Sequence, residues 1–162
     1  MRFKTRHWFG VAVAIVALDQ LTKYLAVLWL DYGDPVAILP GLNFTLVYNT
    51  GAAFSILSEA SGWQRWLFAG VALTVIVVIT LWLRQLGEQQ QWLPLALTLI
   101  LGGAIGNFWD RVALGYVVDF IQIYYENWSW PTFNVADSAI SVGAVMLLLS
   151  GWITRPRGAE TE

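Results

Sequence analysis

Residues 66–86 read WLFAGVALTVIVVITLWLRQL and contain a single charged side chain, Arg84, near their end. About 20 mainly apolar residues in a helix are enough to cross the hydrocarbon core of a bilayer. Because lipid offers no hydrogen-bond partners to open strand edges, a helix is the default conformation for such a segment. This stretch therefore predicts a fold built in a membrane from helices that span it.

Three other segments share this apolar character, namely residues 8–30, 92–110 and 133–153. The first is interrupted by polar residues at 19–23, and the last carries its only charge near its start. A chain of 162 residues has the usual size of one domain. We therefore expect one membrane-embedded, all-α domain, residues 1–162, with four transmembrane helices.

The composition agrees with this class of fold. Hydrophobic residues make up 57% of the chain and charged residues only 12%, whereas about 25% of residues are charged in soluble domains. The net charge of −2 gives no electrostatic case for nucleic acid as a partner. Cysteine is absent, which excludes disulfides, thiolate metal sites and cysteine catalysis. The single histidine, His7, lies in a basic tail, so we expect neither a metal nor a cofactor.

The N-terminus has the basic start and apolar run of a secretory signal peptide. No small-residue cleavage site closes the run, however, and apolar sequence resumes as far as Leu30. We therefore expect a retained membrane helix. Basic residues near the helix ends favour a cytoplasmic location for both termini, with six on the inner side and three on the outer side. The six are Arg2, Lys4, Arg6, Arg84, Arg155 and Arg157, and the three are Lys23, Arg65 and Arg111.

The two outer segments, residues 31–65 and 112–131, are longer than the inner loop. In the first, residues 36–39 and 43–48 flank the turn residues Pro40 and Gly41, which predicts a small extracytoplasmic β-hairpin. The second is partly apolar and aromatic, and we expect it at the membrane interface.

Polar side chains within membrane segments are costly and are therefore functional candidates. Asp19 and Lys23 are four residues apart, so they lie on the same side of a helix and can pair. We expect a structural ion pair that orients the first helix, in preference to a direct part in chemistry.

A second polar group comprises Asn107, Asp110 and Arg111, which the helical repeat places on one face. Gly102 and Gly106 nearby would let another helix approach closely. Asp110 and Arg111 either neutralise each other or Arg111 reaches a carboxylate elsewhere. We expect a scaffolding role, because an arginine beside a catalytic acid would lower the pKa of that acid.

A third group comprises Asp119, Asn134 and Asp137. Asn134 and Asp137 share a face at the start of the fourth helix, and Asp119 lies in residues 116–123, which contain no charge partner. Two unpaired carboxylates near one membrane face can converge on a site. Alternatively, Asn134 is a helix N-cap and the two acids are solvated in loops. The residue pattern alone favours neither alternative.

A fourth candidate is the run of small residues with an asparagine at 48–55. Such a run suits a tight loop in which the backbone approaches a ligand. An ordinary turn is the simpler interpretation when this run is taken alone.

Five stretches together resemble the lipoprotein signal peptidases, also called signal peptidase II, of bacterial inner membranes. They occur in the family's order and extend across nearly the whole chain. The stretches are LDQLTK at 18–23, YNTGAAFS at 48–55, GGAIGNFWDR at 102–111, VVDF at 117–120 and FNVADS at 133–138.

The resemblance implies an aspartic endopeptidase that removes signal peptides from diacylglyceryl-modified prolipoproteins by cleaving before the lipidated cysteine. It implies a catalytic dyad of Asp119 and Asp137, acting at the outer, periplasmic face of the inner membrane. It also implies contact with membrane lipid and inhibition by globomycin-type antibiotics. The residues implied to line the site are Asn49, Gly51, Asn107, Arg111, Asn134 and Ala136, with Asp19, Lys23 and Asp110 as structural support.

Three alternatives remain open from the residues. A Ser-Lys protease would use Lys23 as base and Ser55 or Ser138 as nucleophile. A transporter or lipid-binding scaffold would use its acids to conduct protons, although the absence of an internal repeat argues weakly against it. A purely structural membrane subunit would leave the costly polar groups unexplained.

Overall fold

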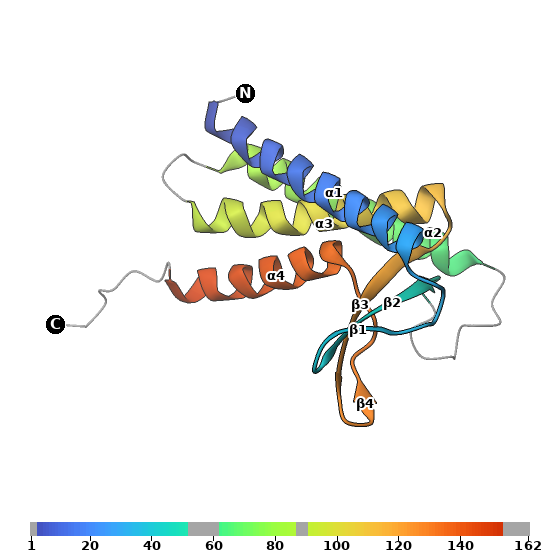
Figure 1. The fold of residues 1–162 in the computed structure, drawn as a ribbon. Helices are drawn as coiled ribbons and strands as arrows, with labels where there is room; N and C mark the ends of the chain where they lie inside the picture. Colours follow the sequence, from blue (N-terminus) through green and yellow to red (C-terminus); the bar gives the residue numbers. More distant parts are fainter. Residues whose placement is uncertain (1–2, 52–61, 87–90, 154–162) are drawn as a thin grey trace.

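The computed structural model describes residues 3–51, 62–86 and 91–153 (Figure 1). Each of the four apolar segments forms a helix, with ends that differ slightly from those predicted. The first, α1, begins at Phe3 and not at residue 8, because the helix continues back through the basic tail. The helices are α1 (Phe3–Trp29), α2 (Trp63–Gln85), α3 (Trp92–Ala113) and α4 (Val135–Ile153).

Three of these helices, α1, α2 and α3, are long and apolar enough to cross a membrane. The fourth helix, α4, is also apolar over residues 135–150, the part whose side chains are described. Large apolar side chains such as Val13, Val78 and Leu148 are exposed on the outer surfaces of the helices. In water this exposure would be unfavourable, and in lipid it carries no such cost.

The central helix is α3, which contacts α1, α2 and α4. Its glycines allow the close approach that the sequence predicted. A Cβ atom on Gly102 would lie 2.8 Å from the side chain of Ile15 in α1, and one on Gly106 would collide with the carboxylate of Asp19. Small residues at such positions let helix backbones approach within a membrane, where no hydrophobic effect draws helices together.

A four-stranded antiparallel sheet projects from one end of the helix bundle (Figure 1). Its strands, in the order β1-β2-β3-β4, are β1 (Val36–Leu39), β2 (Leu42–Asn49), β3 (Val117–Tyr125) and β4 (Trp128–Ser129). The predicted hairpin is therefore present as β1 and β2. The expectation of helices with only a hairpin was too narrow, because the segment expected at the interface supplies β3 and β4.

The sheet is anchored to α1 by a second hydrophobic core. Leu46 of β2 and Val118 and Phe120 of β3 are buried together with Ala26 near the end of α1. In the β2–β3 register, Val47 lies opposite Asp119. This packing fixes the start of β3 against the bundle, and with it the position of Asp119.

Candidate active site

Asp119 lies on β3 and is only 2% exposed. Both oxygens of its carboxylate accept hydrogen bonds from side-chain amides. Asn49, at the end of β2, donates to one oxygen at 2.9 Å, and Asn134, just before α4, donates to the other at 2.7 Å. Within the described part of the chain no cation contacts this buried carboxylate, and neutral amide donors hold it in place.

Asp137 lies in the first turn of α4 and is half-buried. Its Oδ1 accepts a hydrogen bond from the Asn107 amide of α3 at 2.7 Å, and its Oδ2 accepts one from the backbone N–H of Asn134 at 3.2 Å.

Asn134 connects the two carboxylates. Its Oδ1 accepts the backbone N–H of Asp137 at 2.9 Å while Asp137 bonds back to the Asn134 N–H, which is the reciprocal arrangement of a capping box. Its Nδ2 donates to Asp119. The two interpretations left open by the sequence, a helix cap and a site residue, therefore describe the same side chain.

Three asparagine amides are oriented alike around the carboxylates. Each amide oxygen accepts from a group that can only donate: the Gly51 N–H for Asn49 at 2.8 Å, the backbone N–H described above for Asn134, and the Lys23 ammonium for Asn107 at 2.9 Å. Because the oxygen of each amide is bound to a donor, its NH2 group lies on the opposite side, where it donates to Asp119 or Asp137. The orientations of these amides are thus fixed by their surroundings.

Burial raises the pKa of Asp119 from 3.8 to about 6, and the negative charge of Asp137 contributes to the rise. The hydrogen bonds from Asn49 and Asn134 oppose it, because they favour the ionised form. A carboxyl group with a pKa near neutrality beside a second carboxylate can hold or release a proton under ordinary conditions.

Arg111 does not pair with its neighbour Asp110, contrary to the first of the two arrangements considered above. Adjacent helical residues point about 100° apart, and Asp110 turns toward Lys23 instead, at 2.8 Å. Arg111 hydrogen-bonds the Asn107 carbonyl at 3.1 Å, lies over the Phe68 ring, and lines the same hollow as Asp137.

The predicted Asp19–Lys23 pair is present, with 2.9 Å between the charged atoms, and both side chains are buried. The Asp19 carboxylate also accepts the backbone N–H of Ala136 at 2.9 Å. Ala136 is fully buried, and this contact joins the start of α4 to α1.

Gly51 has a φ of 88°, a conformation that favours glycine. A Cβ atom there would lie 2.6 Å from the Phe68 ring. Sequence reasoning missed Phe68, because one phenylalanine in a uniformly apolar helix gives no signal of its own.

Two hollows meet at Asp137. One, of about 310 Å³, lies among α2, α3 and α4 and is also lined by Asn107 and Arg111. The other, of about 400 Å³, lies between α4 and the aromatic side chains of the sheet, including Trp128 and Trp130. Apart from these polar groups and two serines, both hollows are lined by apolar side chains, so a hydrophobic substrate can lie on either side of this carboxylate.

The Ser-Lys alternative gains no support from Ser138, whose hydroxyl donates to the backbone oxygen of Asn134 at 2.9 Å. Lys23 bonds to two carboxylates and an amide and is not available as a neutral base. Ser55 lies outside the described residues. Among the residues that the structure describes, no three His, Asp or Glu side chains gather as a metal site would require.

Comparisons with known proteins agree with this architecture. Residues 11–153 match the family model for signal peptidase (SPase) II. A lipoprotein signal peptidase of Acinetobacter baumannii is 48% identical over 156 residues, covering 94% of this chain and 89% of the relative. One of Pseudomonas fluorescens is 46% identical over 159 residues, covering 97% and 94%. A solved bacterial membrane enzyme superimposes with a TM-score of 0.81 at 30% identity, covering 96% of this chain and 93% of that one.

Proposed function

Because the chain belongs to the signal peptidase II family of aspartic peptidases, we propose that it removes signal peptides from prolipoproteins with Asp119 and Asp137 as its catalytic dyad. The observation that carries the proposal is the convergence of these two carboxylates on Asn134. Asp119 accepts from its side-chain amide and Asp137 from its backbone N–H.

Two carboxylates this closely linked share a proton, because both cannot ionise cheaply in a site of low dielectric. The ionised partner acts as general base on a water molecule, which attacks the scissile carbonyl. The protonated partner polarises that carbonyl and then donates its proton to the departing amine. The pair titrates as a unit, so the role of base is not assigned to one of the two aspartates.

The amides around the dyad have a positioning role in this reaction. Asn49, Asn107 and Asn134 each donate to a dyad carboxylate, which fixes the planes of the carboxyl groups. Arg111 lies beside Asp137 at the edge of the hollow, where its charge can attract the carbonyl oxygen as negative charge develops on it. Gly51 and Ala136 act through the backbone contacts described above.

The substrate is a prolipoprotein that carries a diacylglyceryl group, cut before the lipidated cysteine. Each methylene withdrawn from lipid costs about 0.8 kcal/mol, so the substrate stays in the membrane and the carboxylates must reach it there. The two apolar hollows at Asp137 suit such a substrate, and globomycin-type inhibitors would occupy the same space. The chain spans the inner membrane four times, with both termini in the cytoplasm and the dyad near the periplasmic face.

The decisive experiment offers the purified protein, in detergent, a diacylglyceryl-modified prolipoprotein and its unlipidated twin. We expect cleavage of the lipidated form alone, at the bond before the cysteine. Equal cleavage of both would contradict the substrate assignment.

The dyad is tested by Asp119→Asn and Asp137→Asn in the same assay. Each variant is expected to lose at least about 1,000-fold in kcat, because the reaction needs both the base and the acid. Ser138→Ala removes the candidate serine nucleophile, keeps both carboxylates, and should remain active. Normal turnover by either asparagine variant would exclude the dyad.

A further inference from the structure

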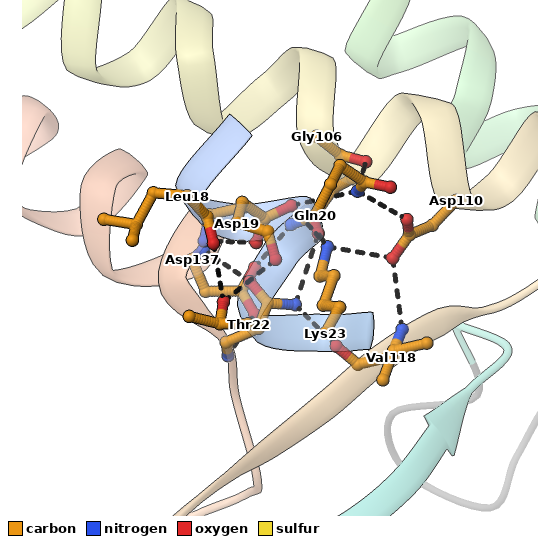
Figure 2. Close-up of polar contacts among 12 residues, drawn as sticks. Leu18, Asp19, Gln20, Thr22, Lys23, Gly106, Asp110, Val118 and Asp137 are labelled. Atoms are coloured by element: carbon orange, nitrogen blue, oxygen red, sulfur yellow. Dashed lines mark hydrogen bonds and ion pairs between the residues drawn. The ribbon is translucent and has the colours of Figure 1, made fainter. Parts of the chain in front are cut away.

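Lys23 is buried, with only 3% of its surface exposed, and its ammonium group has a polar partner for each of its N–H donors. It lies 2.9 Å from Asp19 and 2.8 Å from Asp110 (Figure 2). It also lies 2.9 Å from the side-chain oxygen of Asn107. An ammonium group has three N–H donors, so each donor has one partner. We call Asp19, Lys23 and Asp110 the lysine hub.

One hub carboxylate holds the backbone next to Asp137. Asp19 of α1 accepts the N–H of Ala136, the residue directly before Asp137, at 2.9 Å. This approach requires Gly106 on α3, because a Cβ atom there would collide with the Asp19 carboxylate. The first turn of α4 is therefore held from α1.

The other hub carboxylate does the same for Asp119. Asp110 of α3 accepts the N–H of Val118, the residue directly before Asp119, at 3.2 Å (Figure 2). Each proposed catalytic aspartate thus follows a residue whose backbone N–H is bound by a carboxylate of the hub. Lys23 lies between these two carboxylates and bonds to both.

The third partner of Lys23, Asn107, links it to Asp137 of the proposed dyad. Lys23 holds the oxygen of the Asn107 amide, and the NH2 group of that amide donates to Asp137 at 2.7 Å. Without the ammonium group, the buried like charges of Asp19 and Asp110 would repel each other. Their separation, and that of the two backbone segments they hold, would then change.

We infer that Lys23 is a positioning residue that sets the separation of Asp119 and Asp137, by holding together the two carboxylates that bind the backbone directly before them. The inference rests on the proposed function, since it concerns the geometry of that dyad. It extends the role of the Asp19–Lys23 pair beyond the orientation of one helix.

The expected signature is a loss of kcat without a loss of substrate binding. Lys23 lines neither hollow at Asp137, so KM should stay within about twofold of its normal value. A displacement of reacting groups by about 1 Å costs on the order of 100-fold in rate. We therefore expect Lys23→Met to lower kcat by about 10- to 100-fold, per folded molecule.

Two further variants separate positioning from stability. Lys23→Met/Asp110→Asn removes one positive and one negative charge, so it leaves the net charge of the hub unchanged, and the asparagine oxygen can still accept the Val118 N–H. Leu97→Ala is the control for stability, because Leu97 is fully buried in the hydrophobic core of the helices and lines neither hollow. It should lower the unfolding temperature and leave kcat per folded molecule unchanged.

The experiment measures kcat and KM for cleavage of a diacylglyceryl-modified prolipoprotein, with the folded fraction determined by size-exclusion chromatography in detergent. A lowered kcat with unchanged KM in a folded Lys23 variant, and a normal kcat in Leu97→Ala, support the inference. A folded Lys23 variant with a kcat within twofold of the unaltered protein overturns it. Failure of both Lys23 variants to fold also overturns it, since the hub would then serve folding alone. Activity in Asp119→Asn or Asp137→Asn would instead refute the dyad itself.

Discussion

Asn134 shows at the scale of one residue how the fold and the site share a side chain. Its oxygen caps α4 and its NH2 group holds Asp119. From sequence, the spacing of Asn134 and Asp137 indicated a shared helical face and left the choice between cap and site open. The choice could not be made, because the partner on β3 is brought near only by the tertiary fold.

Substitution of Asn134 separates these two roles. Serine is a good N-cap but is too short to reach Asp119, so Asn134→Ser should keep the stability within about 1 kcal/mol and lower kcat by tenfold or more. Asn134→Ala loses the cap as well and should lower the stability by about a further 1 kcal/mol. Thermal unfolding in detergent and peptidase assays on the same samples measure both. Equal kcat in Asn134→Ser and the unaltered protein would contradict the positioning role.

The raised pKa of Asp119 predicts how stability depends on pH. The folded protein binds the proton more tightly than the unfolded chain, since burial raises this pKa from 3.8 to about 6. The stabilising contribution is therefore fully present below about pH 4 and is lost as the pH rises through about 6. The pKa difference corresponds to roughly 3 kcal/mol.

This dependence is checked by measuring unfolding midpoints between pH 4 and pH 8 for the unaltered protein and for Asp119→Asn. The carboxyl groups outside the pair titrate in both proteins, so the difference between the two curves reports Asp119 together with its coupling to Asp137. We expect Asp119→Asn to gain stability relative to the unaltered protein as the pH rises. A constant difference across the range would show that Asp119 titrates normally.

At the scale of the elements, glycines set how closely α3 and α4 pack. A Cβ atom on Gly103 would collide with the Ala136 carbonyl, next to Asp137, and one on Gly143 would lie 2.6 Å from the Ala96 carbonyl, in the half of the interface away from the dyad. The two positions test the same helix interface at different distances from the site.

We expect Gly103→Ala and Gly143→Ala each to lower the stability by about 1–3 kcal/mol, the usual cost of overpacking. Only Gly103→Ala should also lower kcat, because it displaces the first turn of α4. Gly70→Ala is the control, since no atom lies within 4 Å of its added Cβ. Thermal unfolding and turnover per folded molecule are the measurements. If Gly103→Ala and Gly143→Ala had the same kcat, the packing of α4 at Gly103 would have no specific effect on the catalytic site.

The helices and the first hairpin could be predicted because their signals are local: apolar length in one case, and a Pro-Gly turn between short apolar runs in the other. β3 was not predicted as a strand, since its partner β2 lies about 70 residues earlier, as in the pair Tyr48 and Val118. The partner of Asp110 was missed for a related reason. Its adjacent residue Arg111 suggested a pair, while its actual partner, Lys23, lies on another helix.

At the scale of the whole molecule, the proposed topology puts the sheet and the α2–α3 connection on opposite sides of the membrane. The chain contains no cysteine, so single cysteines report accessibility without a background. Glu126, in the β3–β4 turn, and Gln91, directly before α3, are both exposed.

We expect a membrane-impermeant maleimide to label Glu126→Cys in intact spheroplasts, and Gln91→Cys only after the membrane is permeabilised. Both variants should retain full activity, since neither residue lines a hollow at the dyad. The reverse labelling pattern would invert the topology and move the dyad to the cytoplasmic side.

The separation of the two aspartates along the chain has a consequence for biogenesis. Asp119 belongs to β3, whereas Asp137 belongs to α4, which follows β3 in chain order and therefore leaves the ribosome after it. Until α4 docks, the nascent protein has one member of the pair, and neither Asn134 nor the Ala136 N–H is in place to complete the arrangement. If Asp119 and Asp137 are the catalytic pair, as proposed, the peptidase therefore stays inactive in the membrane until α4 has been made and has docked.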